Sequence, residues 1–252
     1  MSQWVALAIA MVAVCAVVLS VVVLMQRRVT EDDDPSETPD VIEYMVMMIG
    51  VVYAIVIGLA IAGVWEGRGA AQADALAEAQ ALHEVKARVQ VYPAGVRDKV
   101  RADVDAYASY VADKEWPYMR DHASLSAKGT ALLDQVRTDV TQFDPKTDLA
   151  AQAYQPVVDE VAAVDQARAA RGQGAGATMP GMVWFGLISG ALVTVGLIFA
   201  LQIRRSPREL LLAGLFSALI SFLLFLIWEM DAPFGRGLSV SADVIRRIVL
   251  KT

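Results

Sequence analysis

The stretch YMVMMIGVVYAIVIGLAIAGVWEGRGAAQADALAEAQALHEV, residues 44–85, decides the fold. Its first half, Tyr44–Trp65, contains no Asp, Glu, Lys or Arg. A helix crosses a bilayer with roughly 20 apolar residues, so this run is long enough. The second half is polar, rich in alanine and free of proline. We therefore predict one long helix that continues out of the membrane, with Gly67 and Gly69 as its weak points.

Three more runs lack charged residues, namely Met1–Gln26, Thr178–Ile203 and Leu210–Trp228. The chain is 56% apolar and only 20% charged. Its apolar content is higher and its charged content lower than in typical soluble domains, as expected for a membrane protein. The first run has no basic segment before it and is too long for a cleaved signal peptide. We predict a multi-pass protein of the plasma (inner) membrane, embedded in the lipid bilayer. The predicted spans are residues 4–25, 43–65, 180–203 and 210–228.

The polar middle of the chain has apolar residues at steps of three and four, which is typical of amphipathic helices. Prolines and small polar residues interrupt the pattern, with Asp144 and Ser124 or Ser126 as candidate helix caps. The predicted fold is an all-α membrane protein in which a polar helical bundle is inserted between two transmembrane hairpins. Its parts are residues 1–65 (first hairpin), 66–178 (bundle), 179–229 (second hairpin) and 230–252 (interfacial tail). The apolar stripes are Leu82, Val85, Val89 and Tyr92; Val96, Val100, Val104, Tyr107 and Val111; Leu132, Val136, Val140 and Phe143; and Leu149, Val157, Val161 and Val164.

The second span carries a small residue at every fourth position, and the third span does so at Gly186, Gly190 and Thr194. Small residues on one face let helices approach closely, either within a subunit or against a neighbour. Alternatively, this face lines a narrow apolar pore, with an adjoining bulky residue as a dewetting constriction. The candidate pore-lining or packing residues are Gly50, Tyr53, Ala54, Ile57, Gly58, Ile61 and Ala62.

Three acids flank the spans, namely Glu66, Glu229 and Asp231. They are expected either as solvated helix ends or as a ring of acids at a pore mouth in an oligomer. The last two open the stretch EMDAPFGRGLSVS, in which we expect the chain to meet water, turn and lie along the membrane. Phe234 is the expected interfacial anchor, and Ser241 the cap of a short amphipathic helix. The interfacial motif consists of Asp231, Pro233, Phe234, Gly235 and Gly237.

Residues for enzymatic chemistry are sparse. His83 and His122 fall in different predicted helices, and Cys15 is the only cysteine. There is no G-x-S-x-G motif and no phosphate-binding glycine loop. The sequence therefore favours a protein that is not an enzyme and has no metal or cofactor. The net charge of −6 gives no sign of a nucleic-acid surface.

Several stretches occur in an order that resembles a bacterial membrane family of unknown function described as bestrophin-like. They are GVVYAIVIGLAIAGVWEG, ALAEAQALHEV, KEWPYM, TMPGMVWFGLISG and DAPFGRGLSVS. In the last stretch Arg236 stands where the family pattern has a glycine, and Gly237 comes one position later. Resemblance to bestrophins implies an anion channel formed by a ring of subunits, with the second helix of each lining the pore.

Two functions follow from these observations. The first is an ion channel, for anions, that is a homo-oligomer gated by the helical bundle. The alternative is a non-conducting membrane protein whose bundle binds a partner or senses the cell envelope. The arginines of the short loops favour the bundle outside the cytoplasm. The opposite orientation is favoured by the basic residues of the C-terminal tail, Arg236, Arg246, Arg247 and Lys251, and by the resemblance to bestrophins, which keep their polar domain inside.

Overall fold

The computed structural model describes residues 40–200 and 207–251, and within these ranges only helices and turns occur. The predicted first span at residues 4–25, with Cys15, lies outside the described residues. The long helices are α2 (Asp40–Arg88), α3 (Ala94–Tyr110), α5 (Ala127–Thr141), α6 (Asp148–Gln173), α7 (Gly181–Ala200) and α8 (Pro207–Met230). The short elements are α4 (Trp116–His122), α9 (Asp243–Ile245), the 3-10 turn η2 (Val89–Val91) and the π-helical turns η3 (Val111–Glu115) and η4 (Arg246–Leu250).

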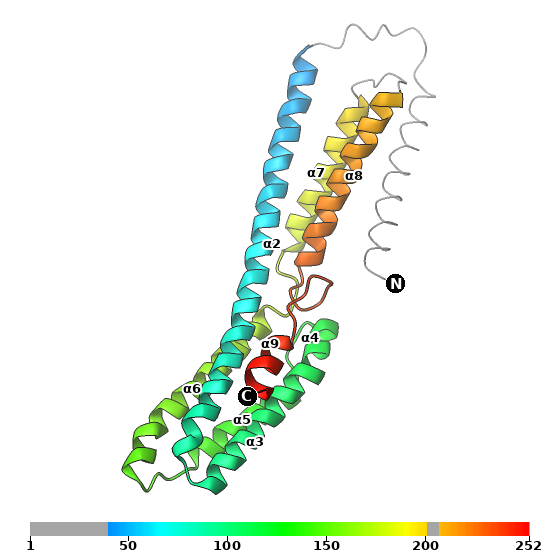
Figure 1. The fold of residues 1–252 in the computed structure, drawn as a ribbon. Helices are drawn as coiled ribbons and strands as arrows, with labels where there is room; N and C mark the ends of the chain where they lie inside the picture. The colour runs from blue at the N-terminus through cyan, green and yellow to red at the C-terminus, as the bar shows by residue number, and fades with distance from the viewer. Residues whose placement is uncertain (1–39, 201–206, 252) are drawn as a thin grey trace. The chain divides into compact units, whose positions relative to one another are not determined.

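The described residues form two compact units (Figure 1). The apolar unit contains residues 40–64 and 179–229, and the bundle unit contains residues 65–178 and 230–251. The chain passes from one unit to the other inside α2, which runs through Gly67 and Gly69 without a break, as predicted. The C-terminal tail belongs to the bundle unit.

Local sequence signals determine where the bundle helices begin and end. Tyr92 is extended because it precedes Pro93, and α3 begins directly after that proline. The Ser126 hydroxyl caps α5 by accepting a hydrogen bond from Gly129 N at 3.1 Å, which confirms one of the predicted caps. The cap of α6 is Thr147 and not the predicted Asp144, with its hydroxyl 3.2 Å from Ala150 N.

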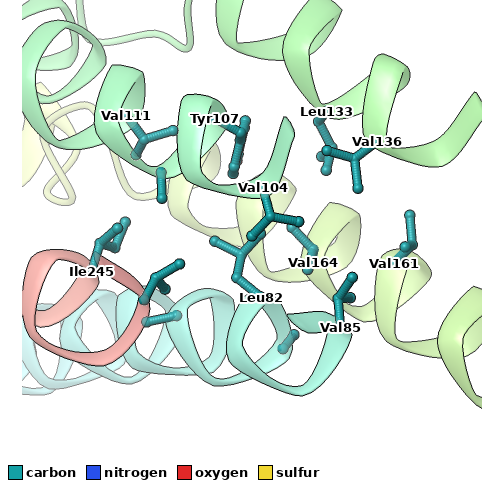
Figure 2. Close-up of a cluster of buried hydrophobic side chains, with 14 of the residues drawn as sticks. Leu82, Val85, Val104, Tyr107, Val111, Leu133, Val136, Val161, Val164 and Ile245 are labelled. Atoms are coloured by element: carbon teal, nitrogen blue, oxygen red, sulfur yellow. The ribbon is translucent and has the colours of Figure 1, made fainter. Parts of the chain in front are cut away.

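The bundle unit is built from the second half of α2 together with α3, α5 and α6. Leu82 and Val85 of α2 face Val104 of α3 in the centre (Figure 2). Most residues of the predicted stripes are buried there, which confirms the periodicity, whereas Leu149 is 60% exposed. The core also contains Leu133, Val136, Val161, Val164 and Ile245.

The tail packs against the bundle. Its helical turns expose one face and bury the other, as predicted, but Ile245 and Val249 are fully buried in the bundle core. Arg246 on the outer face binds Asp113 at 2.8 Å and also contacts the carbonyl of Ala112. The apolar face of this expected interfacial helix therefore packs on protein and not on lipid.

Two described helical segments are long and apolar enough to cross a membrane. They are Tyr44–Val91, which begins in α2 and continues through η2, and Leu211–Met230 within α8. Gly181–Leu197 of α7 is apolar but shorter. Large apolar side chains are exposed along α2, for example Met48 at 69% and Leu59 at 68%. Such a surface is stable in lipid or against another chain.

Candidate functional site

Two bulky residues predicted to line the pore, Tyr53 and Ile57, are packed inside the chain and do not face outward. Tyr53 and Ile57 are buried in the apolar unit. The Tyr53 hydroxyl donates a hydrogen bond to the carbonyl oxygen of Leu187 on α7 at 2.8 Å. Its ring lies against Gly190, where an added β-carbon would come within 2.6 Å of Tyr53 Cε2. Tyr53 is therefore part of the contact between α2 and α7.

The small residues of α2 lie on another face of the helix. Ala54, Gly58 and Ala62 are exposed, whereas Gly50 and Ile61 are half-buried. Among the described residues, no heavy atom outside the helix lies within 4 Å of a β-carbon built at Gly50 or Gly58. This face thus has no partner in the part of the chain that the structure describes.

The three predicted pore-mouth acids differ in exposure. Glu66 is exposed, but Glu229 and Asp231 are only 6% and 2% exposed. Asp231 accepts hydrogen bonds from Thr178, at Oδ1 from the hydroxyl (3.1 Å) and at the carbonyl from the backbone N–H (2.8 Å). The expectation that Glu229 and Asp231 are solvated helix ends is therefore corrected.

The motif after Asp231 packs onto the bundle. Phe234 is 2% exposed and meets the Trp116 ring edge-on at 5.4 Å, so it is not an interfacial anchor. Pro233 is buried, and its carbonyl accepts a hydrogen bond from Val240 N at 2.7 Å. Gly235 is half-buried and Gly237 is exposed. No described glycine has a positive φ. The backbone at position 237 therefore does not need a glycine, and the shift of this glycine by one position causes no strain.

A set of polar side chains that the sequence patterns did not single out lies inside the bundle unit. Glu78, Tyr107, Glu115 and Arg171 are fully buried, and Arg168 is 3% exposed. We call these five residues the buried charge cluster. They come from α2, α3, the π-helical turn η3 and α6, so the cluster joins elements that are distant in sequence.

Glu78 binds two partners in this cluster. Arg171 donates to both of its carboxylate oxygens, from Nε at 2.5 Å and from Nη2 at 3.1 Å. The Tyr107 hydroxyl donates to Oε1 at 2.5 Å. Bidentate pairing with arginine is among the stronger interactions available to a carboxylate.

Glu115 is surrounded by donors in the same way. Arg168 contacts both of its oxygens, with Nη2 2.8 Å from Oε1, and Arg171 Nη2 lies 3.0 Å from Oε2. Ser126 adds its backbone N–H at 2.9 Å and its hydroxyl at 2.8 Å. A β-carbon at Gly129 would lie 2.3 Å from Glu115 Oε1, so only glycine fits beside this carboxylate.

The electrostatics of the cluster favour the ionised form of Glu115. Burial raises the pKa of Glu115, but the hydrogen bond from Arg168 and the charges of Arg171 and Arg168 outweigh it and lower this pKa to about 2. Burial and the charge of Glu78 raise the pKa of the Tyr107 hydroxyl well above its ordinary value. Two carboxylates therefore balance two guanidinium groups. A buried cluster of this kind restricts which helix faces can meet, and it offers no free nucleophile or base.

The two histidines do not meet. His83 is half-buried on α2, and His122 on α4 stacks against Tyr118 with ring centroids 4.1 Å apart. Among the described residues there is no group of three or more His, Cys, Asp or Glu side chains that could hold a metal ion.

Comparison with known proteins identifies the family. The model of the bestrophin-like domain matches residues 12–245. The chain belongs to the bestrophin-like family. Bestrophin-like proteins resemble channels and not enzymes, and the family is associated with membranes. No curated protein matches this bestrophin-like chain.

Solved structures share the fold of this bestrophin-like protein. A variant of a bacterial bestrophin homologue from Klebsiella pneumoniae is 11% identical with a TM-score of 0.70, and the match covers 96% of this chain and 97% of that chain. A second solved structure, of a membrane protein with a proline-to-alanine substitution, is 12% identical with a TM-score of 0.73, and the match covers 100% of this chain and 98% of that chain. At such low sequence identity, the similarity to these structures shows a shared fold and nothing further.

The sequence of this bestrophin-like protein did contain a signal for the buried charge cluster. Arg168 and Arg171 continue the stripe of Val157, Val161 and Val164 along α6 at the same steps of four and three. A charged residue that continues a buried stripe needs a buried partner of opposite charge. Glu115 stands in the family-like stretch KEWPYM, but no periodicity indicates that it faces α6.

Proposed function

We propose that this bestrophin-like protein is an ion channel, conducting anions, formed by several copies of the chain around an axis. The observation that carries the proposal is the exposed small-residue face of α2, at Ala54, Gly58 and Ala62. It lies on a helix long and apolar enough to cross a membrane. The bestrophin-like family and the shared fold support the same conclusion.

In this proposal α2 contributes the small-residue face to the pore, and Tyr53 holds α2 against α7 through its hydrogen bond to Leu187. Ile57 is buried behind the same face. A pore wall of small apolar residues conducts when it is wide and closes by dewetting when it narrows. The constriction is thus assigned to residues on the face of Ala54, Gly58 and Ala62. Glu66, which is exposed one residue beyond Trp65, is the remaining candidate acid at the pore mouth.

The proposal places the protein in the inner membrane with four spans, the first at residues 4–25. The loop arginines favour the bundle outside the cytoplasm, as stated above. A cysteine at exposed Ala102 on α3, in a Cys15→Ser background, tests this orientation. Labelling of intact spheroplasts by a membrane-impermeant maleimide is the expected result, and labelling only after lysis would reverse the orientation.

Recording from purified protein in planar bilayers tests conduction. In the Cys15→Ser background, single cysteines at Ala54, Gly58 and Ala62 should let thiosulfonate reagents block the current. Ile57→Cys is the matched control, because that position is buried against the chain's own helices. Silent bilayers from protein that remains oligomeric by mass measurement would contradict a channel. They would favour the non-conducting alternative.

A further inference from the structure

A pocket in the bundle unit combines positive charge with hydroxyl groups. Arg68, Gln72 and Leu76 line it from one face of α2, at steps of four. The opposite wall comes from the segment after Phe234 and from α9 and η4. That wall consists of Ser239, Val240, Ser241, Val244 and Arg247.

The two arginines of this pocket differ from most others in the bundle unit. No carboxylate among the described residues lies within ion-pair distance of Arg68 or Arg247, whereas eight other described arginines each have such a partner, at positions 88, 97, 120, 137, 168, 171, 236 and 246. The Asp243 carboxylate acts on Arg247 electrostatically, but it is paired with Arg246 and makes no ion pair with Arg247. Two guanidinium groups that face one hollow without a carboxylate in contact favour the entry of an anion.

Backbone contacts leave the outer nitrogens of both guanidinium groups available. Arg68 donates from Nε to the carbonyl of Leu238 at 2.7 Å, and Arg247 from Nε to the carbonyl of Asp243 at 3.4 Å. The Asp243 carboxylate is bound by Arg246 Nη1 at 3.2 Å. The Nη groups of Arg68 and Arg247 therefore remain for a ligand, and such forks fit phosphate oxygens well.

The apolar part of the lining and the position of Arg68 on α2 indicate what kind of phosphate compound the pocket would bind. Leu76, Val240 and Val244 provide apolar surface next to the charges. Arg68 follows Trp65, which is 66% exposed, by three residues, so it lies about 4.5 Å further along the helix. Tryptophan is enriched at the level of lipid headgroups. Arg68 is thus placed where a phospholipid phosphate resides.

We propose that this pocket binds a phosphate anion between Arg68 and Arg247, with the phosphodiester of an anionic phospholipid as its source. The hydroxyls of Ser239 and Ser241 and the amide of Gln72 are within the same lining and complete the set of polar groups. The site is independent of whether the protein conducts ions, since none of these residues lies on the small-residue face of α2.

The test uses the full chain in nanodiscs of phosphatidylcholine, with or without phosphatidylglycerol. Native mass spectrometry counts the phosphatidylglycerol molecules that remain bound after release into detergent. Arg68→Gln and Arg247→Gln should each reduce this retention by about tenfold. Arg97→Gln, which removes the same charge from an exposed pair with Asp98, is the matched control and should leave retention unchanged. Arg68→Lys should retain an intermediate amount.

A second arm distinguishes lipid from free phosphate. Inorganic phosphate is titrated into nanodiscs of phosphatidylcholine alone while the thermal unfolding midpoint is followed. A rise that both Gln variants abolish would identify free phosphate as a ligand of the same site, whereas no rise together with retained phosphatidylglycerol would identify the lipid. Retention that the Gln variants and the Arg97 control change equally, or no binding in either arm, would overturn the proposal. Far-ultraviolet circular dichroism of each variant checks that the helices are intact.

Discussion

Arg171 on α6 and Glu78 on α2 form a bidentate ion pair inside the bundle, with both side chains fully buried. The two residues are separated by ninety-three positions in sequence. Their pairing fixes both the rotation and the height of one helix against the other, because neither charge can be moved to water without separating the helices. The pair therefore acts chiefly on the uniqueness of the packing.

Replacing Arg171 by methionine should destabilise the bundle strongly. The change leaves Glu78 and part of Glu115 as buried carboxylates without their guanidinium partner, which typically costs about 3–5 kcal/mol. The thermal midpoint of the detergent-solubilised protein measures it. Arg137→Met is the matched control, since that arginine is half-exposed in its pairs with Asp134 and Asp165, and we expect a loss below about 1 kcal/mol. Equal losses in both variants would contradict the assignment.

Gly129→Ala should also destabilise, against the usual trend. Alanine in place of a helical glycine normally stabilises by about 0.5–1 kcal/mol. At Gly129 the new methyl group would lie 2.3 Å from Glu115 Oε1 and 2.8 Å from Arg168 Nη2. Gly69→Ala on α2 is the control, because nothing lies within 4 Å of its β-carbon among the described residues. A lower midpoint for the first variant and a higher one for the second are expected.

A pair of carboxyl groups should make bundle stability depend on pH. Asp103 on α3 and Asp139 on α5 each have a buried carboxylate oxygen without a hydrogen-bond partner among the described residues, and the pKa of each depends on the other, so we expect the two groups to share a proton. Burial and this contact with Asp139 raise the pKa of Asp103 to about 6. The folded protein therefore holds a proton that the unfolded chain releases near pH 4. The stabilising contribution is complete below about pH 4 and is lost as the pH rises through about 6.

Asp103→Asn should remove this dependence, because an amide donates to Asp139 at every pH. At about pH 7.5 the variant should have a higher thermal midpoint than the wild type. The gain in free energy of unfolding should be about 1 kcal/mol once solvent screening of the half-buried side chain is included. Thermal melts between about pH 4 and pH 7.5 provide the measurement. Glu115, whose pKa is about 2, contributes with the opposite sign only at more acidic pH. Parallel pH profiles for variant and wild type would exclude the shared proton.

Gly190→Ala should disturb the contact between α2 and α7. A β-carbon there would lie 2.6 and 2.7 Å from two atoms of the Tyr53 ring, whose hydroxyl is held by Leu187. We expect a lower thermal midpoint in detergent, and a double change with Tyr53→Leu should cost less than the sum of the single changes. Gly186→Ala on the same helix meets nothing within 4 Å among the described residues and serves as the control.

The bundle could be predicted from periodicity because its core follows helical spacing. Leu82, Val104 and Val161 all fall on predicted stripes and are buried. The charge cluster was missed because hydropathy patterns assign Arg168 and Arg171 to solvent. Only a three-dimensional partner makes their burial favourable, and the partner Glu115 comes from another element.

For the tail, the sequence pattern predicted the helix face correctly but not what that face packs against. Its amphipathic face was predicted correctly, but an apolar face packs equally well on lipid or on protein. Ile245 contacts the bundle core because the turn after Asp231, with Phe234 against Trp116, directs the chain there. That turn depends on contacts with Thr178 and Trp116, which local sequence does not reveal.

The burial of Ile245 and Val249 among helices 65–178 has a consequence for biogenesis. Ribosomes make these two residues only after α7 and α8, so nascent α3, α5 and α6 wait with an unfilled gap while later segments are inserted. The interior of the bundle is therefore complete only after every preceding segment has been synthesised.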